Sequence, residues 1–259
     1  MSKEIRFHVL LAALILLALP IWILLRSGKS TPVSSAETIA IPSLGIHGTV
    51  RLAGTPPPER PLPLDPNCAA AYAEKFPGAA PRTRFYVRNA EGGLADVLVS
   101  LEGPSPSTNG LGAARVLIEQ RGCRSVPQVV ACLVNQEVSF LNLDPVLHNL
   151  HVMPTNRLNP EYNKAQLPAG PPLSFRFRAP EFFLRIKCDV HPWMFTYVNV
   201  MPHEYHAITD SEGRFSIPQP PPGKYRMRVQ HRKLPPAYRD IVVNPGRGLS
   251  ENFTLSMKR

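Results

Sequence analysis

One segment of the chain alternates in hydropathy and then ends in a short loop: FFLRIKC at positions 182–188 is followed by DVHPWM at 189–194. Apolar side chains occupy every second position, and Arg185 and Lys187 fall between them, which is the two-residue period of a strand with one buried face. We therefore expect a strand whose inward side chains are Phe182, Leu184, Ile186 and Cys188. The next segment, 195–201, is rich in aromatic and β-branched residues and predicts a returning strand.

The loop between these two strands offers metal donors. Cys188, His191 and Met194 supply a thiol, an imidazole and a thioether from one short stretch. A further imidazole, His148, follows the turn signal Asp144-Pro145 upstream. Two nitrogens and a soft sulfur suit both oxidation states of copper, and a weak axial sulfur tunes its reduction potential. The pattern therefore indicates a mononuclear copper site for electron transfer.

Residues 114–201 resemble a cupredoxin. The resemblance is carried by an interior proline (Pro127), a strand ending in FLNLD at 140–144, the His148-Asn149 pair and a CxxHxxM loop with proline after the histidine. The short loop is most similar to that of amicyanins. The resemblance implies a Greek-key β-sandwich that binds one type 1 copper ion through His148, Cys188, His191 and Met194.

The resemblance also assigns roles around the ligands. It implies that His191 lies at the solvent edge and is the electron port. It implies that Asn149 hydrogen-bonds across to the cysteine loop near Asp189, which would orient the ligands. Pro192 and Trp193 would form an apolar docking patch beside the exposed edge of His191. The alternative for Trp193 is that it seals the core.

Other metal sites fit the sequence less well. His151 would face the opposite side of a strand from His148 and is not expected to be a ligand. Structural zinc sites prefer four nitrogen or sulfur ligands, and methionine is a poor zinc ligand. A two-copper purple site needs a second cysteine in the loop and covalent haem needs CxxCH, and the sequence contains neither. A small buried cysteine beside hydrogen-bonded histidines is the alternative to any metal site.

The N-terminal segment predicts a membrane anchor. Residues 9–25 are uncharged and apolar, and Lys3 and Arg6 precede them. Such a run is at the short end of a membrane span and longer than a typical signal-peptide core. We expect a signal anchor with one transmembrane helix in residues 1–26 and a tether at 27–44. The folded domains would then lie on the periplasmic side of a bacterial cytoplasmic membrane.

Cysteine usage agrees with an exported protein. If Cys188 binds metal, then Cys68, Cys123 and Cys132 remain, and an oxidising compartment favours one disulfide among them. The sequence alone does not select the pair. We favour Cys68 with Cys123, because Cys132 lies in the apolar run 129–134 and is typical of a buried core thiol.

A second resemblance lies in the C-terminal segment. Residues 209–217 and 222–229 have the turn and strand rhythm of a small antiparallel sandwich, and they resemble the carboxypeptidase regulatory-like, transthyretin-like domain. Domains of that family begin with strands that 203–259 do not supply, and 48–54 and 94–102 are candidates for them.

We therefore predict an all-β protein in which a cupredoxin domain (111–202) is inserted into a discontinuous sandwich (45–110 and 203–259). The alternative is two sequential domains that meet near residue 202, but the second of these would bury little core.

Composition narrows the function classes. HExxH, GxSxG and phosphate-binding glycine loops are absent, so we expect neither an enzyme nor a small-molecule substrate. The net charge of +10 suits an acidic redox partner or anionic lipid. No aromatic and basic platform for nucleic acid stands out.

These observations favour a membrane-anchored blue-copper carrier that passes single electrons to a redox protein or a larger membrane complex. The alternative is a structural or accessory subunit of a membrane complex that uses the fold without redox copper. Copper delivery or storage is a third, weaker possibility.

Overall fold

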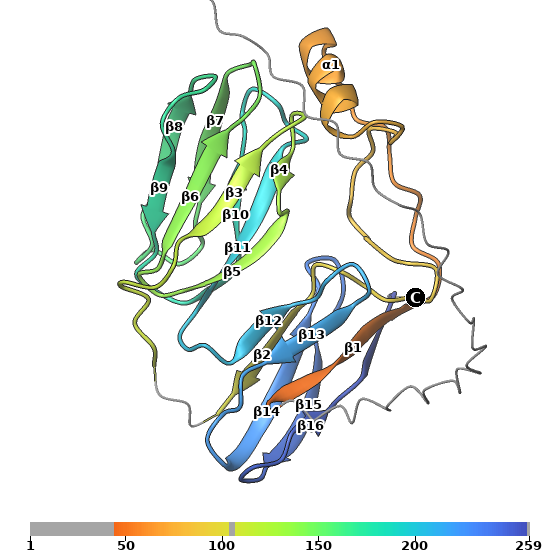
Figure 1. Ribbon diagram of the computed structural model, residues 1–259, viewed down its shortest axis with the longest axis vertical. Coiled ribbons are helices and arrows are strands. Elements are labelled where there is room, and N and C mark those ends of the chain that lie inside the picture. The colour runs from red at the N-terminus through yellow and green to blue at the C-terminus, as the bar shows by residue number, and fades with distance from the viewer. Residues whose placement is uncertain (1–43, 104–106, 258–259) are drawn as a thin grey trace, which may run out of the picture. The chain divides into compact units, whose positions relative to one another are not determined.

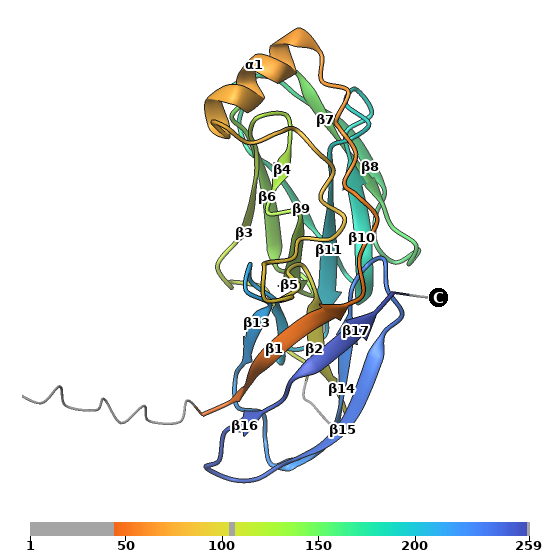
Figure 2. The same ribbon diagram turned by 90° about the vertical axis from the view of Figure 1, so that its right-hand side faces the viewer.

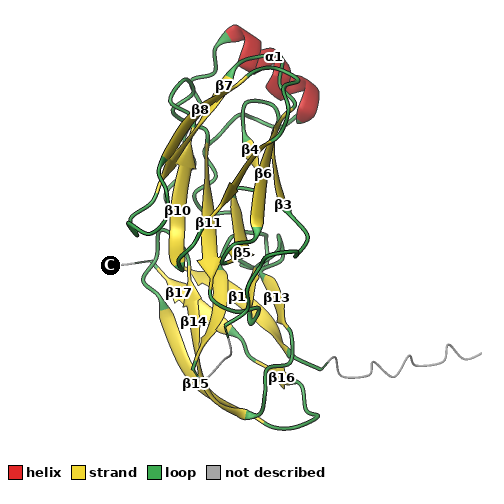
Figure 3. Cartoon of the chain, turned by 90° about the vertical axis from the view of Figure 1, so that its left-hand side faces the viewer, coloured by secondary structure: helices red, strands yellow, loops and turns green. Residues whose placement is uncertain are grey.

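The computed structural model describes residues 44–103 and 107–257. It is mostly β, with 44% of residues in strands and one short helix, α1 (Pro66–Lys75), in the described ranges. Figure 3 distinguishes the helix from the strands by colour. The predicted all-β class is therefore confirmed. In chain order the strands are β1 (Ile46–Ala53), β2 (Leu98–Glu102), β3 (Val116–Gln120), β4 (Ser125–Val126), β5 (Val129–Leu133), β6 (Glu137–Asn142), β7 (His148–Met153), β8 (Tyr162–Gln166), β9 (Leu173–Arg176), β10 (Glu181–Lys187), β11 (Phe195–Met201), β12 (His206–Ile208), β13 (Arg214–Ile217), β14 (Gly223–Gln230), β15 (Ala237–Val243), β16 (Leu249–Ser250) and β17 (Phe253–Ser256).

One pair of sheets combines strands from both ends of the described chain. β1 pairs antiparallel with β13 and parallel with β16 and β17, and the views in Figures 1 and 2 show β1 beside these C-terminal strands. The other sheet has the order β12-β2-β14-β15. Tyr225, Met227 and Val229 of β14 are buried while Lys224 and Arg226 are exposed, so one face of this sheet packs on the core. The exact limits of the discontinuous domain stay a prediction.

The second pair of sheets is built from the strands between residues 116 and 201. Its sheets have the orders β4-β3-β6-β9 and β5-β11-β10-β7-β8. β7 lies between β8 and β10, and β10 lies between β7 and β11. Their inward side chains form a separate apolar core that includes Ile118, Phe140, Val152 and Ile186. The ends of β7 and β10 carry the candidate ligands.

The alternation expected along β10 fails at its start. Leu184, Ile186 and Cys188 are buried as expected, but Phe182 is 39% exposed. The pairing of β10 with β11 shifts register between Glu181 and Leu184, and Phe183 adopts a positive φ of 53°. A bulge inserts one unpaired residue and so reverses the side-chain parity before it. The prediction that Phe182 faces the core was therefore wrong.

Helix α1 belongs to a long excursion between β1 and β2. Asp65 caps the helix by accepting hydrogen bonds from the backbone N–H groups of Asn67 and Cys68, and Pro66 suits its first position. Cys68 is joined by a disulfide to Cys123, the pair that we favoured from the sequence. Cys132 is a free, buried thiol, and burial raises its pKa to about 12. The disulfide therefore fastens α1 to the second pair of sheets.

In the described ranges, no helix is long and apolar enough to span a membrane. The predicted anchor at 1–26 and the tether at 27–44, apart from Leu44, lie outside the described residues.

Candidate metal centre

The candidate ligands lie on two neighbouring strands and the loop that follows one of them. His148 is the first residue of β7, and Cys188 directly follows β10. β7 and β10 are antiparallel neighbours, with Lys187 opposite His151. His191 and Met194 lie in the loop before β11, which is closed by two backbone hydrogen bonds, Cys188 N–H to Met194 O and Met194 N–H to His191 O. This turn returns the loop to the end of β10.

The three strongest donors converge on one point. Nδ1 of His148 lies 2.9 Å from Nδ1 of His191, and Sγ of Cys188 lies 4.0 Å and 3.7 Å from these two nitrogens. All three side chains are buried. Met194 is 2% exposed and packs in one small cluster with Cys188. Two imidazole nitrogens and a thiolate around one point, with a thioether close by, form a donor set that fits a soft metal ion such as copper.

His148 is oriented by Asp144, a carboxylate with no solvent exposure. The N–H at Nε2 of His148 donates to Oδ2 of Asp144 over 2.9 Å, and this contact turns Nδ1 toward the sulfur of Cys188. Asp144 also accepts hydrogen bonds from the backbone N–H groups of Gly122 and Cys123. Burial lowers the pKa of His148, but the hydrogen bonds to Asp144 and Cys188 outweigh burial, and the pKa ends above its usual value.

The sequence analysis treated Asp144 only as part of a turn signal. Its position four residues before His148 was the one sign that its side chain could reach the ring.

His191 is covered by the segment that begins α1. Nε2 of His191 lies 3.6 Å from a carboxylate oxygen of Asp65, and the sulfurs of Cys68 and Cys123 lie within 4.8 Å of a nitrogen of its ring. His191 is only 6% exposed. Burial and the neighbouring His148 lower its pKa. The expectation that His191 presents an exposed edge was therefore wrong, because α1 and its disulfide close over it.

The asparagine and aspartate singled out from the sequence flank the cysteine. The backbone N–H of Asn149 lies 3.4 Å from Sγ of Cys188, and its side-chain oxygen accepts from the backbone N–H of Asp189. Asp189 also contacts Lys187 and His151, each in a geometry suited to an ion pair. The hydrogen bond with Lys187 holds the pKa of Asp189 well below its usual range. His151 therefore lies outside the donor set. It contacts the carboxylates of Asp189 and Glu161 and none of the candidate ligands.

Cys188 lies where its thiolate is favoured. Burial raises its pKa, but hydrogen bonds from His148, from the backbone of Asn149 and from its own loop outweigh burial, so the pKa ends below the usual value. A thiolate is the form that binds metal.

The two remaining loop residues have different exposure. Pro192 is exposed, whereas Trp193 is partly buried and donates from Nε1 to the backbone oxygen of Cys123 over 3.1 Å. The Trp193 ring lies 5.3 Å from the His191 ring between centroids. Trp193 thus packs beside His191 and is partly exposed, and Pro192 is at the surface.

Comparison with known proteins adds one family match. Residues 196–256 match the family model of the carboxypeptidase regulatory-like domain. The second resemblance seen in the sequence is thereby confirmed. The carboxypeptidase regulatory-like match begins inside β11, which pairs with β5 and β10 in the other pair of sheets, and it ends at the last residue of β17. A search of curated proteins finds no match to the chain.

Solved structures similar to part of the chain include several copper proteins. A copper-containing nitrite reductase from Thermus scotoductus is 21% identical, with 34% of this chain and 22% of that chain covered and a TM-score of 0.31. A purple cupredoxin from Nitrosopumilus maritimus is 21% identical over 33% of this chain and 99% of that one, with a TM-score of 0.29. Amicyanin from Paracoccus versutus is 13% identical over 40% of this chain and 97% of that one, with a TM-score of 0.30.

Proposed function

We propose that this protein is a one-electron carrier with a single type 1 copper site. The observation that carries the proposal is the convergence of His148 Nδ1, His191 Nδ1 and Cys188 Sγ within 4.0 Å of one another. Met194 would be the weak axial ligand, since it is buried beside Cys188. Copper in such a site supplies reversible one-electron oxidation and reduction.

The protein's own residues would hold the donors in place through both oxidation states. Asp144 fixes the ring of His148, and the backbone N–H of Asn149 supports the thiolate of Cys188. Both groups are buried in the second pair of sheets. Ligands held in this way by outer hydrogen bonds need little rearrangement when the charge of the site changes.

We further propose that the carrier works at a bacterial cytoplasmic membrane, anchored by residues 1–26, with its folded domains in the periplasm. Its electrons would pass to or from a redox protein or a larger membrane complex. The disulfide between Cys68 and Cys123 supports an oxidising compartment, because such bonds are rare in the cytosol.

One observation favours the second candidate, an accessory subunit without redox copper. The Asp65 segment and the disulfide cover His191, whereas a carrier needs a route for electrons to the surface. Copper delivery also needs access to the ligands, and this cover opposes it equally.

Copper titration of the full chain in detergent separates these functions. The carrier should develop an intense visible thiolate-to-copper band with one equivalent of Cu(II), and Cys188→Ser should abolish it. Cys132→Ala is the matched control, because it removes the other free buried cysteine and should leave the band intact. A wild-type protein that binds no copper would rule out the carrier and favour the accessory role, and one that takes up only Cu(I) without colour would favour delivery.

A further inference from the structure

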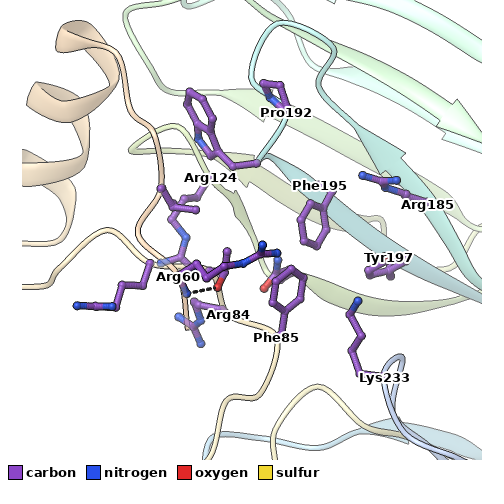
Figure 4. Close-up of a pocket in the computed structure, with 14 residues that line it drawn as sticks. Arg60, Arg84, Phe85, Arg124, Arg185, Pro192, Phe195, Tyr197 and Lys233 are labelled. Carbon is purple, nitrogen blue, oxygen red and sulfur yellow. Dashed lines mark hydrogen bonds between the residues drawn. The ribbon is translucent and has the colours of Figure 1, made fainter. Parts of the chain in front are cut away.

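A basic cavity opens where the candidate ligand loop meets the surface. It has a volume of about 350 Å³, and Pro192 and Trp193 form part of its wall. Figure 4 shows the cavity with Pro192 labelled. Aromatic rings of Phe85, Phe195 and Tyr197 line it as well. Its cationic lining residues, called the basic rim below, are Arg60, Arg82, Arg84, Arg124, Arg185 and Lys233. Among the described residues, no aspartate or glutamate lines this cavity.

The charges of the basic rim are not neutralised by neighbouring side chains. Across residues 44–103 and 107–257, no carboxylate lies within ion-pair distance of any of the six. Glu59 is the nearest acid along the chain, and its oxygens are already bonded to the hydroxyl of Thr83 and the backbone N–H of Tyr86. Asp96 is partly buried, and burial raises its pKa despite the attraction of Arg84, Arg232 and Arg124. The cavity therefore presents unpaired positive charge.

The rest of the loop offers no equivalent surface to a partner. Asp65 covers the edge of His191, so His191 is reached from outside only through its neighbours. At the other end of the loop, Val190 is exposed beside the carboxylate of Asp189. That carboxylate already contacts Lys187 and His151, so an acidic partner finds no unpaired positive charge there and is attracted at the basic rim instead. Pro192 and Trp193, which line the basic cavity, are therefore the part of the loop that an acidic partner can approach.

We propose that the basic rim docks a carboxylate-rich surface of an electron-transfer partner, and that Trp193 and Pro192 are the contact through which electrons enter or leave. The inference rests on the proposed copper function and names the partner class and contact surface for that site. A protein surface suits this cavity better than a small anion does. Five of the six cations are exposed around the opening and only Arg124 is partly buried, so the floor lacks a set of buried donors.

The first test measures binding alone, in the full chain carrying Cys188→Ser, so that it does not depend on copper. Hexaglutamate peptide titrated calorimetrically at low ionic strength should bind, and binding should weaken as salt is added. Replacing Arg60 and Arg84 by glutamate should weaken binding by about tenfold or more. The matched control replaces Arg51 and Arg247 by glutamate; both are exposed and make no ion pair in the described chain, and the net charge changes equally. The control should keep most of the binding.

Two results would overturn the docking proposal. One is equal loss of hexaglutamate binding in both double variants, which would mean that only net charge matters. The other is saturable binding of inorganic pyrophosphate to the basic rim with no binding of hexaglutamate, which would make the cavity a small-anion site.

The second test follows electron transfer in the copper-loaded wild-type background. One electron passes from the reduced protein to hexacyanoferrate(III), which becomes hexacyanoferrate(II), and no proton is transferred. The bimolecular rate should fall about tenfold in the Arg60 and Arg84 double variant, and should not fall with the cationic oxidant tris(phenanthroline)cobalt(III). Equal rates in the variant and wild type with both oxidants would overturn the proposal. Absence of a visible copper band in the wild type would defeat the carrier function, while the peptide test would still decide the docking surface.

Discussion

His148 and His191 present the same ring atom to Cys188, but the protein holds them in different ways. His148 starts a central strand, has no exposure, and donates to a fully buried aspartate over 2.9 Å. His191 lies in a loop and faces Asp65 over 3.6 Å, and the Asp65 side chain is 43% exposed. One half of the site is thus part of the sandwich core, and the other half is closed by a segment that a disulfide fastens from elsewhere in the chain. We expect the two halves to respond differently to mutation.

Removal of the disulfide should give the largest effect. Cys68→Ala with Cys123→Ala should lower the free energy of unfolding by about 4 kcal/mol, because the bridge spans 55 residues and restricts the unfolded chain. Hydrogen exchange should rise in α1 much more than in β7. Cys132→Ala controls for loss of a buried sulfur without loss of a cross-link. Equal exchange increases in α1 and β7 would show that the two halves are one unit.

Removal of Asp144 should give the next largest effect, and this effect should fall on the half of the site that contains His148. Asp144→Ala leaves the N–H groups of Gly122 and Cys123 and the ring of His148 without their acceptor, which should lower the free energy of unfolding by about 3 kcal/mol. Asp144→Asn should weaken copper binding by about tenfold to a hundredfold. The free energy of unfolding is measured by denaturant unfolding, and the copper affinity is measured by titration. A change of less than about 0.5 kcal/mol in the free energy of unfolding for Asp144→Ala would contradict the conclusion that Asp144 holds His148 rigidly in the sandwich core.

Changes at Asp65 should be milder. Asp65→Ala removes the N-cap of α1 and should lower the free energy of unfolding by about 1 kcal/mol. Asp65→Asn keeps a capping oxygen and removes the charge near His191, so stability should change little. Comparing the two variants by thermal unfolding separates the cap from the charge. If Asp65→Ala lost as much free energy of unfolding as Asp144→Ala, His191 would be held as rigidly as His148.

The smallest effect is expected outside the donor set. His151→Gln removes a partly exposed contact with Asp189, and the free energy of unfolding should change by about 0.5 kcal/mol or less. The visible copper band should keep its position and intensity, because His151 faces away from the donors. A lost or shifted band would give His151 a role that its placement does not provide.

The sequence was a good guide where one local segment carried the information. The alternation of Leu184, Ile186 and Cys188 predicted their burial, and the spacing of the loop brought Cys188, His191 and Met194 together. The error at Phe182 came from a bulge, since one unpaired residue changes parity without changing the apolar pattern.

Such patterns could not predict which side chains contact the two histidines. Asp65 lies beside His191 although the two are far apart in the sequence, and the cover over His191 comes from that long-range contact and from the disulfide that joins α1 to Cys123. Asp144 was nearer, but a turn signal describes backbone geometry and does not say where the side chain donates or accepts. Hydropathy periods specify which face of a strand is buried, and they contain no information on which distant segment covers a loop.

The pairing of β1 with β17 also imposes an order on folding. The backbone N–H of Thr49 in β1 donates to the side-chain oxygen of Asn252, the residue before β17, across 203 residues of sequence. Because synthesis proceeds from the N-terminus, the sheets between residues 116 and 201 can form while β17, the last neighbour of β1, has not yet been made. Contacts of such large sequence separation form late and slowly. A chain that ends before Phe253 would leave most of one side of β1 as an open edge, which is a template for pairing with another copy.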